Sequence, residues 1–425
     1  KSLMPSMQLD SVRSLLRNFG LEADLRTQCI ILAGILTAVL PLEIHHLVAM
    51  VLGAAGYMFL QKLEPTVRRR EPQVKRRSSS DMEKKFQEKR EVRVMKEVKK
   101  PSVVPVQAPK FQATGFDAEV KELLQNLQLT NTVRAQVDSI TQRVKDLLLP
   151  IFQGSTTLEG YALANPLTGT AFGVAVPDVE IVVTSGSNAQ VVGPEAAKYQ
   201  KSLIRTCTDR LVTGGFKFRR SAFRGNEPKV TLISPPSPDG QAGIPFNLSV
   251  NAMTPSRAQR IFEACQRCPC AAELLLLERR WAKDRGISHA AKGHLSPYCW
   301  MLLGIYYLQE VGILEPGLGF LNSTPKTKST MSSAELFKSF MRFYANFSWT
   351  EVVSVRGHRS KALPMRMVDG VAAPVIEDPF ELGVDLANGM HSQSLQRLRD
   401  ELRRSCELCA RGASLAELLE PWVPP

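Results

Sequence analysis

The spacing of hydrophobic residues changes along the chain and predicts different kinds of segment. Between residues 116 and 149 they recur at helical spacing. The short apolar runs 179–183, 230–232 and 246–250 predict buried strands. Beyond residue 255 the pattern is mostly helical. We therefore expect an α+β fold, in which a mixed-sheet domain over residues 111–255 precedes a mainly helical domain over residues 256–425.

The N-terminal region contains two long apolar runs, Cys29–Leu42 and Ile44–Leu60, which meet at Glu43. Roughly 17–25 residues are needed to span a bilayer, and a single helix through both runs would place Glu43 near the bilayer centre. We predict a membrane-inserting helical hairpin over residues 27–61, preceded by an amphipathic segment over residues 1–26. A buried hairpin in a soluble protein is the alternative.

Residues 62–110 form a basic linker with one polar helix and a proline-rich end. The chain carries a net charge of +13, and residues 68–100 hold 14 Lys and Arg against 6 Asp and Glu, a local excess of +8. Such a tract suits anionic lipid, RNA phosphates or an acidic protein surface, with a solvated tether as the alternative. Basic residues after an apolar run also predict that the C-terminal domains lie on the cytoplasm-like face.

Cysteine usage indicates a reducing compartment, because eight cysteines in 425 residues show no disulfide pattern. One alternative use is a tetrahedral zinc site built from two groups, Cys265, Cys268 and Cys270 with Cys406 and Cys409. The chain starts at Lys1, which would suit removal of a targeting peptide. We expect an organelle membrane, mitochondrial or plastid, with the C-terminal domains on the matrix or stroma side.

Acidic residues follow one predicted strand at a spacing of two. Asp178 and Glu180 in the segment Pro177–Val183 would point to one face of that strand. Paired carboxylates are common ligands of divalent metal ions. Upstream lie two short turns, Gly154-Ser155 and the nearer alternative Gly169-Thr170, each of which could offer a backbone amide and a hydroxyl to an anion. Ordinary strand-end acids are the other interpretation.

Five further segments carry a family resemblance. They are Leu277–Ser288, Gly293–Tyr298, Met301–Gln309, Leu336–Arg356 and Ile376–Glu381. Together with the acidic strand and Pro245–Asn251, they resemble the motifs of the noncanonical poly(A) polymerase and terminal uridylyltransferase family of the nucleotidyltransferase superfamily. The resemblance covers residues from about 115 to 425. It implies a nucleotidyltransferase-type sheet domain followed by a helical poly(A)-polymerase-associated domain.

The resemblance also implies roles for individual residues. The catalytic and metal-binding positions are Asp178, Glu180 and, on the neighbouring strand, Asn247. The nucleotide-binding positions are Gly154, Ser155, Arg279, Lys283 and Tyr298. In the family the two basic helix residues contact phosphates and the tyrosine stacks on the base. An active member would use Mg²⁺ and ATP.

The chain departs from the family at several substrate-binding positions. Asn247 replaces the third carboxylate, and a neutral amide supplies neither charge for a second cation nor a base for the attacking hydroxyl. Pro297 replaces a serine that contacts the triphosphate, and Ala258-Gln259 replaces an Asn-Thr pair that binds the sugar. Val384 replaces the histidine of uridylyltransferases, so any remaining base preference favours adenine.

Two functions follow from this pattern. In the first, a catalytically degenerate nucleotidyltransferase serves as a structural or RNA-binding subunit of an organelle membrane assembly, with protein partners. In the second, an active membrane-tethered noncanonical poly(A) polymerase adds adenosines to RNA 3′ ends. The segments that hold domains together match the family better than the residues that touch substrate, which favours the first.

Overall fold

The structure, a computed structural model, describes residues 108–152, 156–166, 177–185, 194–223, 227–236, 240, 242–323, 331–357 and 363–422. The segments predicted over residues 1–26 and 27–61, and nearly all of the basic linker, lie outside these ranges. So do Gly154, Ser155, Gly169 and Thr170. Across the described ranges, no helix is both long and apolar enough to cross a bilayer.

The helical pattern between residues 116 and 149 belongs to two helices, α5 (Phe116–Leu127) and α6 (Asn131–Leu148). The break falls at Thr130, whose backbone is extended and whose hydroxyl caps α6 by accepting a hydrogen bond from the Val133 amide at 3.3 Å. Helix α5 packs against helices of the C-terminal part, whereas α6 packs against the sheet. The two helices therefore serve different cores.

Five strands form one sheet in the order β1-β2-β5-β4-β3, in which β2 and β5 are parallel and the other neighbours antiparallel. Their bounds are β1 Thr156–Ala162, β2 Val179–Ser185, β3 Lys217–Ala222, β4 Lys229–Ile233 and β5 Pro245–Val250. The three apolar runs lie within β2, β4 and β5, which confirms those predicted strands. Strands β1 and β3 escape prediction because polar residues interrupt them and few of their side chains are buried.

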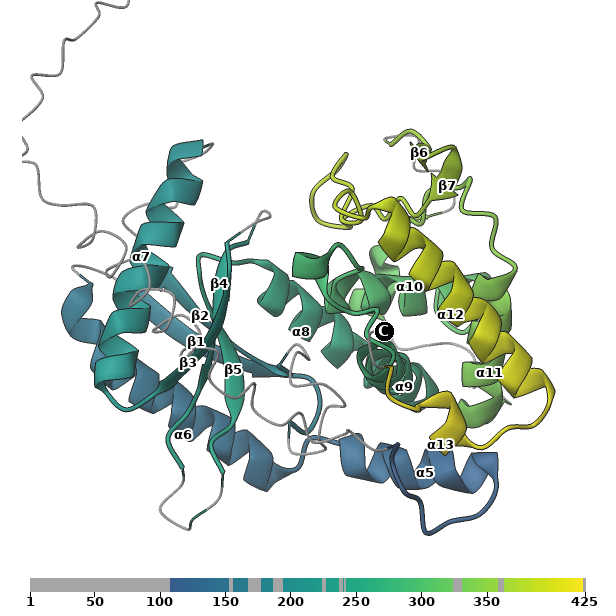
Figure 1. The fold of residues 1–425 in the computed structure, drawn as a ribbon, viewed down its shortest axis with the longest axis horizontal. Helices are drawn as coiled ribbons and strands as arrows, with labels where there is room; N and C mark the ends of the chain where they lie inside the picture. Colours follow the sequence, from purple (N-terminus) through teal and green to yellow (C-terminus); the bar gives the residue numbers. More distant parts are fainter. Residues whose placement is uncertain are drawn as a thin grey trace, which may run out of the picture. The chain divides into compact units, whose positions relative to one another are not determined.

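Two helices cover the sheet on the side away from the C-terminal helices (Figure 1). Helices α6 and α7 (Pro194–Thr213) pack on the strands and on each other. The core between them contains Val144, Ile181, Ile204, Leu211 and Phe246. This first core holds β2 and β5, the two strands that carry the predicted acidic positions.

The C-terminal part is built from helices around a second core. These helices are α8 Thr254–Cys265, α9 Pro269–Asp284, α10 Pro297–Glu310, α11 Ser333–Ala345, α12 Ser392–Ala410 and α13 Leu415–Leu418, with a hairpin of β6 Arg366–Val368 and β7 Val371–Ala373. Trp281 of α9 and Trp300 of α10 are fully buried and meet edge-on, with ring centroids 5.3 Å apart. Side chains of α5 and Leu163 belong to this core as well. A mixed α+β architecture is thus confirmed, while the predicted boundary near residue 255 stays a prediction.

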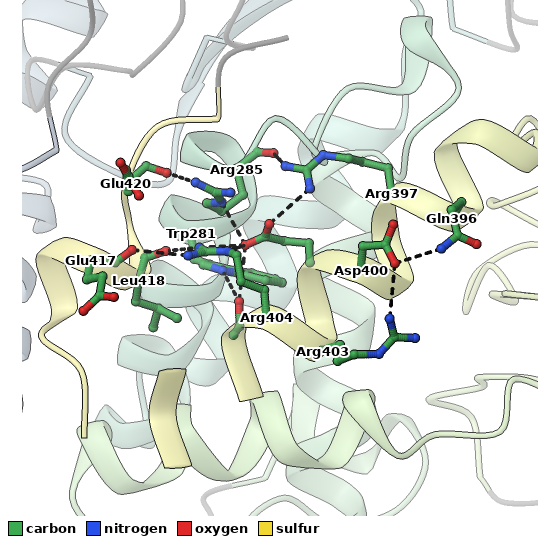
Figure 2. Close-up of polar contacts among 12 residues, drawn as sticks. Trp281, Arg285, Gln396, Arg397, Asp400, Arg403, Arg404, Glu417, Leu418 and Glu420 are labelled. Atoms are coloured by element: carbon green, nitrogen blue, oxygen red, sulfur yellow. Dashed lines mark hydrogen bonds and ion pairs between the residues drawn. The ribbon is translucent and has the colours of Figure 1, made fainter. Parts of the chain in front are cut away.

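One face of α9 forms hydrogen bonds with α12 (Figure 2). The Trp281 indole donates to the Ser405 hydroxyl at 3.0 Å, and the Arg285 guanidinium donates to the Glu401 carboxylate at 2.8 Å. All four side chains are buried. Trp281 of α9 and Arg285, which directly follows α9, both belong to the motif Leu277–Ser288, so this half of the motif holds helices together.

The buried Glu401 is the centre of a cationic cluster that also holds the following segment. Its carboxylate contacts three arginines, Arg285, Arg397 and Arg404. Two of these continue outward: Arg404 donates to the Leu418 carbonyl at 2.8 Å, and Arg285 donates to the Glu420 carbonyl. The cluster therefore fixes α13 and the chain beyond it against α9 and α12.

Two more family-like segments interlock with each other. The Ser354 hydroxyl donates to the Glu377 carboxylate at 2.7 Å, and the Glu377 amide donates to the Val353 carbonyl at 3.0 Å. The Arg356 guanidinium donates to the Pro379 carbonyl at 2.6 Å. The segments Leu336–Arg356 and Ile376–Glu381 therefore stabilise each other through hydrogen bonds.

The contact between α9 and α10 gives a test of the packing. A Cβ at Gly304 would lie 2.5 Å from Leu275 Cδ2, whereas a Cβ at Gly389 would meet nothing within 4 Å. We expect Gly304→Val to lower the free energy of unfolding by roughly 1–3 kcal/mol, because the Leu275 methyl can yield to a single Cβ but two further methyl groups overpack the contact with α9. Urea unfolding of this variant beside Gly389→Val measures the difference. Equal stability of the two variants would contradict the packing described.

Candidate nucleotidyltransferase-type site

The predicted acidic positions gather where β2 begins. Asp178 directly precedes β2, and Glu180 is its second residue. The parallel register places Asn247 of β5 opposite Glu180. The sheet therefore brings the D-x-E strand and the third predicted position side by side, as period-two geometry requires.

Asp178 is held by two cations from α9. Its Oδ1 accepts from Arg279 Nε at 2.9 Å and its Oδ2 from Lys283 Nζ at 2.6 Å. Arg279 and Lys283 are four residues apart and so lie on one face of the helix. The side chains of Asp178 and Lys283 are only 9% and 3% exposed.

Burial and ion pairing act in opposite directions on this carboxyl group. Burial raises the pKa of Asp178, but the charges of Lys283 and Arg279 and their hydrogen bonds outweigh it. The pKa of Asp178 therefore lies below its usual range. The direction follows from the geometry, because each oxygen faces a cationic donor.

Glu180 is held by an amide and an ammonium group. Asn247 Nδ2 donates to Glu180 Oε1 at 2.8 Å, and Lys229 Nζ lies 3.4 Å from the same oxygen. On its other side, the Asn247 carbonyl accepts from the Thr231 hydroxyl at 2.7 Å. Asn247 is 2% exposed and uses both ends of its amide. The amide is thus part of a satisfied buried network.

A small pocket of about 80 Å³ opens onto these groups. Asp178 and Glu180 line it together with Arg279 and Tyr298. Tyr298 lies in the first turn of α10, is 4% exposed, and its hydroxyl has no hydrogen-bond partner. Burial raises the pKa of Tyr298, with Asp378 adding to the effect. Four of the predicted site residues, Asp178, Glu180, Arg279 and Tyr298, thus line one pocket. Asn247 is linked to this group by its bond to Glu180, and Lys283 by its bond to Asp178.

The departures from the motif pattern have clear local roles. Pro297 is the first residue of α10, where the missing amide hydrogen costs nothing, and Ser296 caps the helix by accepting from the Cys299 amide at 3.1 Å. Ala258 lines the small pocket, whereas Gln259 lines a different cavity and donates to Glu263 at 2.7 Å. Neither residue of this pair thus reproduces a sugar-binding Asn-Thr.

The sequence is similar to a PAP/OAS-like domain and to poly(A) RNA polymerases. Residues 271–414 match the family described as Nrap protein PAP/OAS-like domain. The poly(A) RNA polymerase GLD2 of Mus musculus is 27% identical over 172 residues, which are 34% of this chain and 35% of the relative. GLD2-A of Xenopus laevis is 23% identical over 273 residues, 58% of this chain and 51% of the relative. The chain thus spans between about a third and a half of these relatives.

Solved structures show the same fold. A mutant of mtPAP in complex with ATPgammaS has a TM-score of 0.56 at 16% identity, with 73% of this chain and 74% of that chain covered. A mutant of the Cid1 poly(U) polymerase bound to MgATP has a TM-score of 0.52 at 18% identity, with 72% and 98% covered. This chain thus shares the fold of mtPAP and of the Cid1 poly(U) polymerase, and part of its sequence is similar to the poly(A) RNA polymerase GLD2.

The site offers few free oxygen donors for metal ions. Both oxygens of Asp178 contact side-chain cations, and the third position is a neutral amide. Across the part of the chain that the structure describes, no group of three or more His, Cys, Asp or Glu residues could hold a metal ion. These side chains do not fit the pair of Mg²⁺ ions that two-metal transfer requires. The same finding leaves the zinc alternative without support among the described cysteines, although Cys268 and Cys270 have their sulfurs 3.5 Å apart.

Three residues of the site region were not predicted from the sequence. Lys229 and Thr231 lie on β4 at a spacing of two and face the β2–β5 pair. The third, Glu278, is 1% exposed, and burial raises its pKa well above the usual range. It directly precedes Arg279 on α9. Alternation along β4 was the only signal for the first two.

The Asp178 ion pairs give a stability test. In Asp178→Ala the ammonium of Lys283 stays buried without its carboxylate, and we expect a loss of roughly 3–5 kcal/mol in the free energy of unfolding. The double variant Asp178→Ala/Lys283→Met removes the buried charge and is expected to recover most of this loss. Chemical denaturation of the three proteins measures it. Wild-type stability of Asp178→Ala would show that these ion pairs do not hold the fold.

Proposed function

We propose that this protein binds RNA 3′ ends as a catalytically degenerate nucleotidyltransferase, acting as a structural or RNA-binding subunit. The observation that supports the proposal is the double ion pair on Asp178. Arg279 and Lys283 neutralise the carboxylate that the family uses for metal. Their side chains are nearly buried there, so the contact is part of the packed structure.

Charge counting around the carboxylates supports the same function. Three side-chain cations, Arg279, Lys283 and Lys229, lie within 3.4 Å of the carboxylates of Asp178 and Glu180. With Glu227, a third carboxylate in the pocket lining, the charges balance. The pocket therefore has no net negative charge to attract a divalent ion.

RNA is the proposed ligand for two reasons. Residues 68–100 supply +8 of the net charge of +13, which favours polyanions at the basic linker, and the relatives are named as poly(A) RNA polymerases. The proposed location is an organelle membrane, mitochondrial or plastid, and rests on the predicted hairpin 27–61. The proposed partners are membrane lipid and protein subunits, with the basic linker on an anionic lipid, RNA or acidic protein surface.

An active poly(A) polymerase is the second candidate. It is favoured by the shared pocket, in which Asp178 and Glu180 lie beside Tyr298 and Arg279. Such an enzyme would need Mg²⁺ and ATP, with Asp178 and Glu180 released from their present partners. Val384 in place of the uridylyltransferase histidine favours adenine in that case.

Transfer of labelled ATP or UTP to an oligo(A) primer distinguishes the two candidates. We expect no extension by the 425-residue chain with Mg²⁺ or Mn²⁺, because the carboxylates are paired with side-chain cations. RNA binding measured on the same preparation shows that the protein is competent. Extension that is abolished by Asp178→Ala would establish an enzyme and reject the degenerate function.

The amide at position 247 gives a test that needs no catalysis. In Asn247→Asp a second carboxylate faces Glu180 at about the present 2.8 Å contact, and repulsion between them favours a divalent cation. We expect Mn²⁺ to stabilise this variant, by about 2.7 kcal/mol at a hundredfold excess over the Kd, and to leave the wild type unchanged. Thermal unfolding with and without Mn²⁺ measures the effect. Equal stabilisation of both proteins would mean that the native site already binds the metal.

A further inference from the structure

A cavity with a volume of about 280 Å³ is lined by Leu163 and lies near the site. It opens where the turn between α5 and α6 meets α8 and α9. Its floor is apolar, with Leu163 and Phe262 buried, while Gln128, Arg134 and Gln266 at its rim are exposed. The cavity therefore combines buried apolar lining residues with exposed polar ones.

The amide of Gln259 is the most informative group in this cavity. Its nitrogen donates to Glu263 at 2.7 Å, but its oxygen is shielded from solvent and accepts no hydrogen bond. A sheltered acceptor of this kind costs free energy unless a ligand or water satisfies it. The ligand that fits must bring a hydrogen-bond donor on a small and otherwise apolar body.

Chemistry and size restrict the ligand class. Drug-sized ligands occupy pockets of about 300 Å³ and upward, so this cavity suits a small ring system. Amide side chains read the donors and acceptors on the edge of a nucleobase, and an aromatic floor stacks on its face. Arg134 is a single rim cation, and Glu273 in the same wall offsets it, which argues against a phosphate as the group bound inside.

The cavity lies next to the carboxylate pocket. Leu163 lines both, and a narrow void lined by Leu163, Phe262 and Arg279 lies between them. We propose that this cavity binds one nucleobase, that of the 3′-terminal nucleotide of an RNA. The inference rests on the RNA binding proposed above and adds where the last base is held. Free nucleosides share the same chemistry and are the other possible source.

Two variants test the site in the full chain. Ala272→Phe fills the cavity from α9, where Ala272 is half-buried, and Gln259→Leu removes the amide. The matched controls are Gln396→Leu, which removes the equivalent bond from Gln396 to Asp400 at 2.8 Å on α12, and Ala345→Phe at an exposed position of α11. Thermal unfolding confirms that each variant folds. If Ala272→Phe fails to fold, Gln259→Leu decides.

Binding is measured by fluorescence anisotropy with 5′-labelled oligo(A), either intact or with an abasic 3′-terminal nucleotide. We expect the abasic end to weaken wild-type binding about tenfold, as loss of one stacked base does. Ala272→Phe should weaken binding of intact RNA by a similar factor and lose nothing more with abasic RNA. The controls should bind as the wild type does. The slope of affinity against salt should not change, because no phosphate contact is lost.

Each other outcome has a defined meaning. Wild-type RNA binding that is unaffected by either cavity variant and by the abasic end overturns the base site and leaves RNA binding intact. If the chain binds no RNA, both proposals fail. Binding of free adenosine or cytidine that is detected by NMR and lost in Ala272→Phe, while RNA binding is unaffected by Ala272→Phe and by the abasic end, would support a nucleobase site but overturn its assignment to RNA ends.

Discussion

Helix α9 must satisfy two polar faces at once, and the rest of the structure depends on this constraint. Arg279 and Lys283 contact Asp178 at the sheet, whereas Trp281 and Arg285 contact α12. Residues two positions apart on an α-helix point in nearly opposite directions, since each residue turns the helix by about 100°. The helix is therefore a cross-link between the sheet and the C-terminal bundle. Any shift along its axis would break polar contacts on both sides.

This arrangement explains why the segment Leu277–Ser288 resembles the polymerase motif although its Arg279 and Lys283 bind Asp178. The residues facing α12 are buried and satisfy the Glu401 cluster, so replacing them would leave charges without partners. The residues facing the sheet satisfy Asp178 in the same way. The structural contacts alone therefore account for the residues of this motif in this chain.

Much of the fold can be predicted from the sequence. The parts that could not be predicted depend on contacts between residues that are distant in sequence. The strands β2, β4 and β5 are short apolar runs, and the Asp178–Glu180 spacing placed both acids at the pocket. The different partners of α5 and α6 were not readable, because both helices show the same hydrophobic spacing. Lys229 and Thr231 were missed for a similar reason, since their importance arises only from pairing with β5, a contact distant in sequence.

The polar contacts of α12 in Figure 2 could not be predicted either, for the same reason. Arginines on α12 look like a solvated helix surface in the sequence, but Arg397 and Arg404 converge on the buried Glu401. Charged residues at helical spacing usually mark an exposed face. Here both arginines form ion pairs with one buried carboxylate, and only the folded structure shows this contact.

The hydrogen bond between Asn247 and Glu180 shows that the two carboxylates of the site are held independently. Glu180 is held within the sheet, because the Asn247 amide on β5 donates to it and also accepts from Thr231 on β4. Asp178 is held by Arg279 and Lys283 of α9 instead. A change at position 247 therefore alters the surroundings of Glu180 and leaves both ion pairs of Asp178 in place.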